Sequence, residues 1–167
     1  MQDLISTPLP TTRLELLARV HALLLYHIIR LFDGNIQARG AAEGTRPALE
    51  TAAVALLNHI DFERLAPADA SGDDPLPLYP LATTRQFWHE WIYQESAKRT
   101  FIVTFFMLQT YRHLSGDIPM QCDSRLYRCY SWTLSAYLWQ AADAVDFAVA
   151  WKQRNHFAIT STKYAYR

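Results

Sequence analysis

The chain has 167 residues, of which half are hydrophobic and 13% aromatic, and its 16 basic and 16 acidic residues cancel to zero net charge. A chain of this length suits one domain that buries about 70% of its unfolded surface. The balanced charge argues against an autonomous nucleic-acid binder, which carries a basic surface. No apolar run reaches the roughly 18 residues of a membrane span, and the N-terminus lacks the pattern of a signal peptide.

Metal and cofactor chemistry has little support in the sequence. Cys122 and Cys129 have no second cysteine pair beside them, so neither a zinc site nor a disulfide framework is predicted. The chain lacks a Gly-rich phosphate loop, a nucleophile elbow and an HExxH motif. We therefore expect no cofactor, no metal and a reduced intracellular protein of the cytoplasm or nucleus.

The first helix is predicted to begin at a capping box formed by Thr12 and Glu15. Its expected buried face comprises Leu14, Leu17, Ala18, His21, Leu24, Leu25, Ile28 and Phe32. His21 lies within that face, where it is either a core histidine with one hydrogen bond or an imidazole that faces a ligand. His27 is expected on the other side of the helix.

Glycine and proline residues divide the next part of the chain. Residues 35–60 are predicted to form two helices, the second of which begins near Pro47. Residues 62–82 are rich in proline and aspartate, which indicates an irregular connection that is either a plain loop or a lid over a pocket.

The longest helix is predicted from Thr84, as N-cap, to Leu114, before a stop at Ser115 and Gly116. One face is expected to hold Trp88, Trp91, Ile92, Glu95, Arg99, Ile102, Val103 and Phe106. The other face becomes apolar at Phe101, Phe105 and Leu108, which is typical of a central helix packed on several sides.

Two charges on a buried stripe need a physical reason. Glu95 and Arg99 are four residues apart with the acid first, the favourable order for an ion pair on one helix. The pair either fixes the register of the helix and bonds neighbouring backbone groups, or it presents an acid with a perturbed pKa to a cavity. Simple surface exposure is a third alternative.

The remainder of the chain is less regular. Pro119 argues against a continuous helix over residues 116–131, whereas residues 132–153 are predicted to be helical, with Leu138, Trp139, Ala142, Val145, Ala148 and Val149 on one face. Residues 155–167 are expected to be a short tail. The fold class is therefore all-α, a compact single helical domain over residues 1–167 built around one long central helix.

Three stretches together resemble the regulatory, or middle, domain of fungal zinc-cluster transcription factors. They are ARVHALLLYHIIRLFDGNIQARG, the block Trp88, Trp91, Glu95-Ser96 and Arg99-Thr100, and the later Thr133, Ser135 to Trp139 and Ala141. The resemblance spans about residues 14–150 and implies an all-α fold, a fungal source and gene regulation, often of secondary-metabolite clusters. The six cysteines of the family's DNA-binding module and the long helical continuation are missing, so the chain is either a fragment or a stand-alone descendant.

Three functions follow from this resemblance. The favoured hypothesis is a stand-alone protein that binds an apolar small-molecule metabolite and acts as a cyclase or isomerase in secondary metabolism. Its expected catalytic residues are Glu95, His21 and Arg99, and its expected ligand-binding residues are Trp88, Trp91, Tyr93, Tyr111 and Trp139. The alternatives are a fragment of a transcriptional regulator that binds DNA only through a partner, and a non-catalytic interaction module. We expect no direct contact with nucleic acid or membrane, while an exposed apolar patch would allow homo-oligomers.

Overall fold

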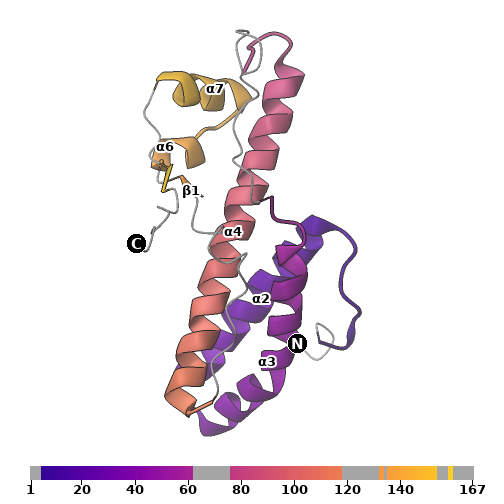
Figure 1. Ribbon diagram of the computed structural model, residues 1–167, viewed down its shortest axis with the longest axis vertical. Helices are drawn as coiled ribbons and strands as arrows, with labels where there is room; N and C mark the ends of the chain where they lie inside the picture. The colour runs from indigo at the N-terminus through magenta and orange to yellow at the C-terminus, as the bar shows by residue number, and fades with distance from the viewer. Residues whose placement is uncertain (1–4, 62–75, 118–131, 134, 154–157, 160–167) are drawn as a thin grey trace, which may run out of the picture. The chain divides into compact units, whose positions relative to one another are not determined.

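The computed structural model describes residues 5–61, 76–117, 132–133, 135–153 and 158–159. Its helices are α2 (Arg13–Phe32), α3 (Ile36–Leu57), α4 (Leu81–Ser115), α6 (Ala136–Trp139) and α7 (Ala144–Gln153). Two short strands, β1 (Trp132–Thr133) and β2 (Ala158–Ile159), form one antiparallel pair. The expected all-α fold class is therefore confirmed (Figure 1). The predictions for residues 62–75 and 118–131 lie outside the described residues.

The chain divides into two compact units. Unit 1 comprises Met1–Ile60 and Thr100–Gln121, and unit 2 comprises Asp61–Arg99 and Cys122–Arg167. Helix α4 contributes its residues 81–99 to unit 2 and its residues 100–115 to unit 1. A single domain over the whole chain stays a prediction. In the described parts of both units, no helix is long and apolar enough to cross a membrane.

Helix α2 begins where its capping box predicts. The Thr12 hydroxyl oxygen accepts from the backbone N–H of Glu15, and the hydroxyl donates to the Glu15 carboxylate at 2.7 Å. The predicted buried face is wrong in part: Leu14 is 68% exposed and Phe32 is 77% exposed. The residues that are buried instead are Leu16, Leu17, Arg19, Val20, Leu23, Leu24, His27 and Leu31. Leucines lie on almost every side of this helix, so its sequence did not define which side packs.

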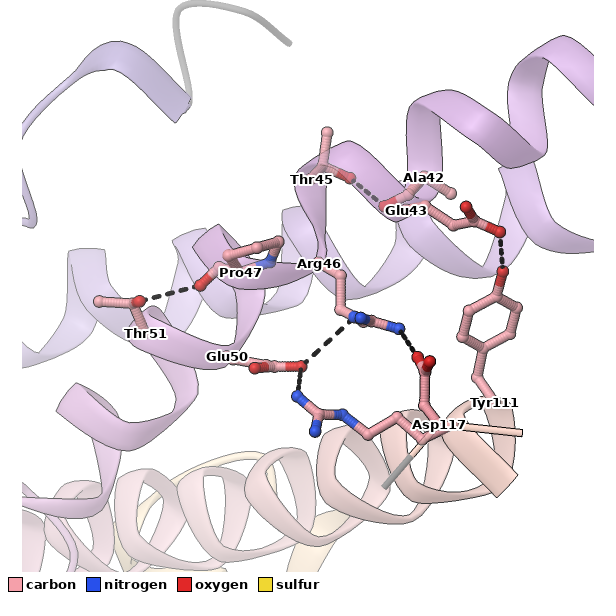
Figure 2. Close-up of polar contacts among 10 residues, drawn as sticks. Ala42, Glu43, Thr45, Arg46, Pro47, Glu50, Thr51, Tyr111 and Asp117 are labelled. Carbon is pink, nitrogen blue, oxygen red and sulfur yellow. Dashed lines mark hydrogen bonds and ion pairs between the residues drawn. The ribbon is translucent and has the colours of Figure 1, made fainter. Parts of the chain in front are cut away.

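Helix α3 is continuous, which corrects the expected break into two helices. Asn35 caps its start by accepting from the backbone N–H groups of Gln37 and Ala38, and Pro47 lies inside it. Proline removes one backbone hydrogen bond and commonly kinks a helix without ending it, and the ribbon changes direction near Pro47 (Figure 2). Helices α2 and α3 pack against each other within unit 1.

Helix α4 is the longest element, as predicted, but it begins earlier than expected. Leu81 is its first residue, so Thr84 is not the N-cap; the buried Thr84 hydroxyl instead donates to the carbonyl oxygen of Pro77 at 2.6 Å. The predicted stop is confirmed. Gly116 has φ +75°, its N–H donates to His113, and the N–H of Asp117 donates to Arg112, which together form a Schellman motif.

Burial around α4 covers most of its circumference, in agreement with a helix packed on several sides. Trp91 and Ile102 of the predicted stripe are buried, as are Phe101, Phe105 and Leu108 of the other face. Val103 and Phe106 were expected to be buried, yet they are 52% and 47% exposed. They lie on the narrow exposed strip of the helix, which the apolar pattern alone could not locate.

The core of unit 2 gathers around Trp91 and Phe147. Its buried members are Leu76, Trp91, Leu138, Phe147 and Ala148. The single helix predicted over residues 132–153 is wrong, because this stretch contains β1, α6 and α7. Asp143 breaks it: its carboxylate accepts from the N–H groups of Val145 and Asp146 at 2.8 and 2.9 Å and thereby caps a new helix. Of the predicted face, Leu138 and Ala148 are buried, whereas Trp139, Val145 and Val149 are exposed.

Candidate functional site

Glu95, the first predicted catalytic residue, projects from α4 in unit 2 and is only 6% exposed. Its Oε2 atom accepts from the backbone N–H of Thr133 at 3.1 Å and from the Thr133 hydroxyl at 3.3 Å. A buried carboxylate is costly unless it is hydrogen-bonded in this way. The carboxylate therefore holds β1 against α4.

Arg99 completes the contact with the same backbone segment. Its guanidinium lies 3.5 Å from Glu95 Oε2 and donates to the carbonyl oxygen of Thr133 at 2.5 Å. We call Glu95, Arg99 and Thr133 the Thr133 clasp. Both side chains of the pair were expected to be buried, but the Arg99 side chain is 39% exposed. Its guanidinium lies over the ring of Trp139, which is itself 38% exposed, at 5.1 Å from the centroid.

The surroundings of Glu95 favour its protonated form. Burial raises the pKa of Glu95 above its usual value, and the backbone N–H of Thr133, the charges of Arg99 and Lys98 and the Thr133 hydroxyl oppose this shift. Such an acid is a candidate proton donor. Within the clasp, however, it bonds a neighbouring backbone group, as the register-fixing alternative predicts. A catalytic role for Glu95 and Arg99 stays a prediction.

Three of the five predicted ligand-binding aromatics lie in one cluster. The Trp91 ring is 5.0 Å from the Trp139 ring and 5.3 Å from the Phe147 ring, and Trp88 is 6.3 Å from Phe147. Trp91 is 1% exposed and thus a core residue, whereas Trp139 is 38% exposed. The indole N–H of Trp88 is buried and has no hydrogen-bond partner among the described residues. Trp88 and Trp139 are therefore the predicted residues of this cluster that keep some exposed surface.

The two predicted tyrosines are not among the residues of that cluster. Tyr93 is buried in unit 2, and Tyr111 belongs to unit 1. The Tyr111 hydroxyl donates to Glu43 Oε1 at 2.5 Å. Burial and this hydrogen bond raise the pKa of Tyr111 above its usual value, so its phenol is neutral at neutral pH.

The two histidines of α2 exchange their expected places. His27, expected on the outer side, is 1% exposed and packs edge-on against Tyr111 with 6.2 Å between ring centroids. His21 is exposed, and its Nε2 lies 2.5 Å from the Thr100 hydroxyl. Burial lowers the pKa of both imidazoles. His21 belongs to unit 1, whereas Glu95 and Arg99 belong to unit 2.

A second polar network, in unit 1, was missed by the sequence analysis (Figure 2). Arg46 of α3 pairs with Asp117 at 2.8 Å and lies 3.7 Å from Glu50, which in turn pairs with Arg112 of α4 at 2.6 Å. The spacing of Arg46 and Glu50 is that of a local helix pair and was a usable signal. The partners Arg112 of α4 and Asp117, just after α4, are distant in sequence, and no local pattern indicated them.

Metal binding has no support in the described part of the chain, where no group of three His, Cys, Asp or Glu side chains is placed to hold an ion. Cys122 and Cys129 lie outside the described residues. The expected absence of a metal stays a prediction.

Comparison with known proteins shows that the sequence of this chain is similar to that of a transcription factor. Transcription factor gsfR2 of Penicillium aethiopicum is 30% identical over 158 residues, which cover 94% of this chain. The chain is therefore similar to part of a fungal transcription factor. It spans 36% of that protein's length. The resemblance predicted from the sequence is thus confirmed, whereas no protein-family model and no solved structure matches the chain.

Proposed function

We propose that this chain is a regulatory helical module of the fungal transcription-factor type, which acts through protein contacts and does not itself recognise duplex DNA. The similarity to gsfR2 over 94% of the chain carries this proposal. The zero net charge supports the second half of it, because duplex binding depends on neutralising several phosphates with basic side chains. An intracellular location, in nucleus or cytoplasm, belongs to the same proposal.

A tethering assay tests the regulatory role. The chain is fused to an unrelated DNA-binding domain in a fungal host, and the output of a reporter gene carrying that domain's operator is measured. We expect the fusion to change the output relative to the domain alone. Trp91→Ala is the control for folding, since it removes a side chain that is 1% exposed at the centre of unit 2. An output equal to that of the domain alone would contradict the regulatory role.

A gel-shift titration tests the absence of direct DNA recognition. The isolated chain is titrated against genomic fragments at about 0.05 and 0.2 M salt, a range over which phosphate-driven binding falls steeply. We expect no retained fragment at either concentration. Tight, salt-sensitive retention of a defined fragment would instead return the chain to the class of direct DNA binders.

A second candidate is a small-molecule-binding protein with cyclase or isomerase activity in secondary metabolism. It is favoured by the raised pKa of Glu95 and by the position of Arg99, the partner of Glu95, over the Trp139 ring. In this proposal Glu95 donates a proton, while Trp88 and Trp139 orient an apolar metabolite. Homo-oligomers would form through exposed apolar side chains.

Incubation with the metabolite pool of a fungal host, followed by mass spectrometry, tests this candidate. If Glu95 moves a proton, Glu95→Gln should lower turnover by about 100-fold. If shape alone promotes the reaction, Trp88→Ala should lower turnover more than Glu95→Gln does. Neither retention nor conversion of any compound would remove this candidate.

A further inference from the structure

Unit 1 contains a cavity that the predicted site does not include. It is bordered by the C-terminal end of α2, the N-terminal part of α3 and the last turns of α4, and it encloses about 570 Å³. Small-molecule sites typically have volumes of about 300–1,000 Å³. The cavity therefore has the size to hold a compound of two or three fused rings.

One wall of this cavity is apolar and projects into solvent. Leu31 is buried at its base, while Phe32 and Leu114 are 77% and 79% exposed at its border. Large apolar side chains that gather at a concave surface commonly mark a binding site. Such a wall suits the faces of a planar ring system.

Polar side chains of α3 and α4 also line the cavity, among them Arg39, Glu43 and Tyr111. Arg39 and Glu43 both belong to α3. The Tyr111 hydroxyl donates to Glu43 Oε1 at 2.5 Å (Figure 2). The second carboxylate oxygen of Glu43 remains available as an acceptor. The Arg39 guanidinium forms no ion pair or side-chain hydrogen bond with another residue of the described ranges. Arg39 thus offers a donor beside the acceptor of Glu43, and the formal charges of these two side chains cancel.

We propose that this cavity binds a neutral fused-ring phenol. The rings would lie against Phe32 and Leu114, and the phenolic hydroxyl would donate to Glu43 while accepting from Arg39. An anionic ligand would be attracted by Arg39 but repelled by Glu43. A cationic ligand would be attracted by Glu43 but repelled by Arg39. The two opposite charges therefore favour a neutral ligand. The binding site rests on the cavity alone. Its role as an effector site rests on the proposed regulatory function.

Isothermal titration calorimetry of the full chain tests the ligand class with 2-naphthol as the probe. We expect saturable binding at one site. 2-Methoxynaphthalene keeps the rings but cannot donate a hydrogen bond, and 2-naphthoate carries a negative charge, so both should bind about tenfold more weakly or worse. Equal affinity for 2-naphthol and 2-methoxynaphthalene would overturn the assignment of Glu43 as acceptor and with it the ligand class.

Two matched tryptophan substitutions test the location. Leu114→Trp adds bulk at the border of the cavity, whereas Leu25→Trp adds the same bulk at a 60% exposed position of α2 outside it. We expect Leu114→Trp to raise the Kd of 2-naphthol by about tenfold. Leu25→Trp should leave this Kd unchanged. Equal affinities of the two variants would overturn the location. Glu43→Gln provides an independent variant, which should weaken 2-naphthol more than 2-methoxynaphthalene.

The remaining outcomes separate this proposal from its competitors. If size-exclusion chromatography shows a dimer that Leu114→Trp disperses, the occupant is a second copy of the chain and the proposal fails. The tethering assay needs no added ligand. A chain that alters reporter output but binds no naphthol therefore overturns only the cavity proposal, and the converse result overturns only the regulatory one.

Discussion

The backbone N–H of Thr133 donates to the Glu95 carboxylate at 3.1 Å, although the two residues are 38 positions apart in the chain. Arg99 donates to the carbonyl oxygen of the same Thr133 residue at 2.5 Å. Both backbone polar groups of one residue in β1 are thereby satisfied by two side chains from adjacent turns of α4. The Glu95–Arg99 pair therefore stabilises unit 2 by joining two segments that are distant in sequence.

Glu95→Ala should destabilise the protein by about 3 kcal/mol, because it leaves the buried N–H of Thr133 without an acceptor and Arg99 without its partner. Glu95→Gln should cost less, about 1 kcal/mol, since its amide oxygen can still accept. Urea unfolding followed by circular dichroism measures both. Asp146→Ala is the matched control, as an exposed acid of unit 2 in the first turn of α7, with an expected cost of about 0.5 kcal/mol. A near-neutral Glu95→Ala would show that the clasp is dispensable.

Stability should depend on pH through Glu95. Because burial raises its pKa in the folded state above the usual value of 4.5, the folded protein binds more protons than the unfolded chain between the two pKa values. The free energy of unfolding therefore contains a contribution that is complete below about pH 4.5 and is lost as the pH rises through the folded pKa. The natural chain and Glu95→Gln are unfolded at several values from pH 4 to 8. The free energy of unfolding of the natural chain, minus that of the variant, should decrease as the pH rises. A difference that rises would contradict the raised pKa.

Trp91 and Trp139 should differ sharply when truncated. Trp91 is 1% exposed and contacts the Phe147 ring, so Trp91→Ala should cost about 3–5 kcal/mol. Trp139 is 38% exposed, and its loss should cost about 1–2 kcal/mol, which includes the cation–π contact with Arg99. Denaturant midpoints of the two variants check this ranking. Equal costs would mean that Trp139 is as much a core residue as Trp91.

Glu50 and Arg112 should be energetically coupled in unit 1. Their side chains are 21% and 20% exposed and lie 2.6 Å apart, so a double-mutant cycle with alanine should give about 1 kcal/mol. Salt should reduce this value, because an ion pair that is still partly exposed is screened. The Arg46–Asp117 pair is the comparison; its acid is 45% exposed, and its coupling should be smaller, about 0.3 kcal/mol. A larger coupling for Arg46–Asp117 would contradict this ranking by exposure.

Local signals predicted helix ends well where they were complete within a few residues. The Thr12–Glu15 capping box and the stop at Gly116 depend only on adjacent backbone and side-chain groups, and both are formed. Pro47 was misinterpreted and the helix start at Asp143 was overlooked for a related reason. Proline can kink a helix without ending it, and an aspartate can begin a new helix inside an apolar pattern.

Which side of a helix is buried could not be predicted in the same way. Helix α2 carries leucines on nearly all sides, and its packing against α3 selects Leu16 and His27 over Leu14 and His21. The Glu95–Arg99 pair was predictable from its spacing, but its shared partner Thr133 comes from a distant segment. The cavity beside Tyr111 was equally hidden, because it exists only where three helix ends meet.

The clasp contacts position 133 chiefly through its main-chain atoms. Any amino acid that carries a backbone N–H would offer the same two contacts, and only proline would not. During evolution, this position should therefore exclude proline while an acid and an arginine persist at the positions of Glu95 and Arg99. In an alignment of this chain with its relatives, proline should be absent at this position wherever the acid and the arginine are both kept, a restriction that a partnership between side chains alone would not impose.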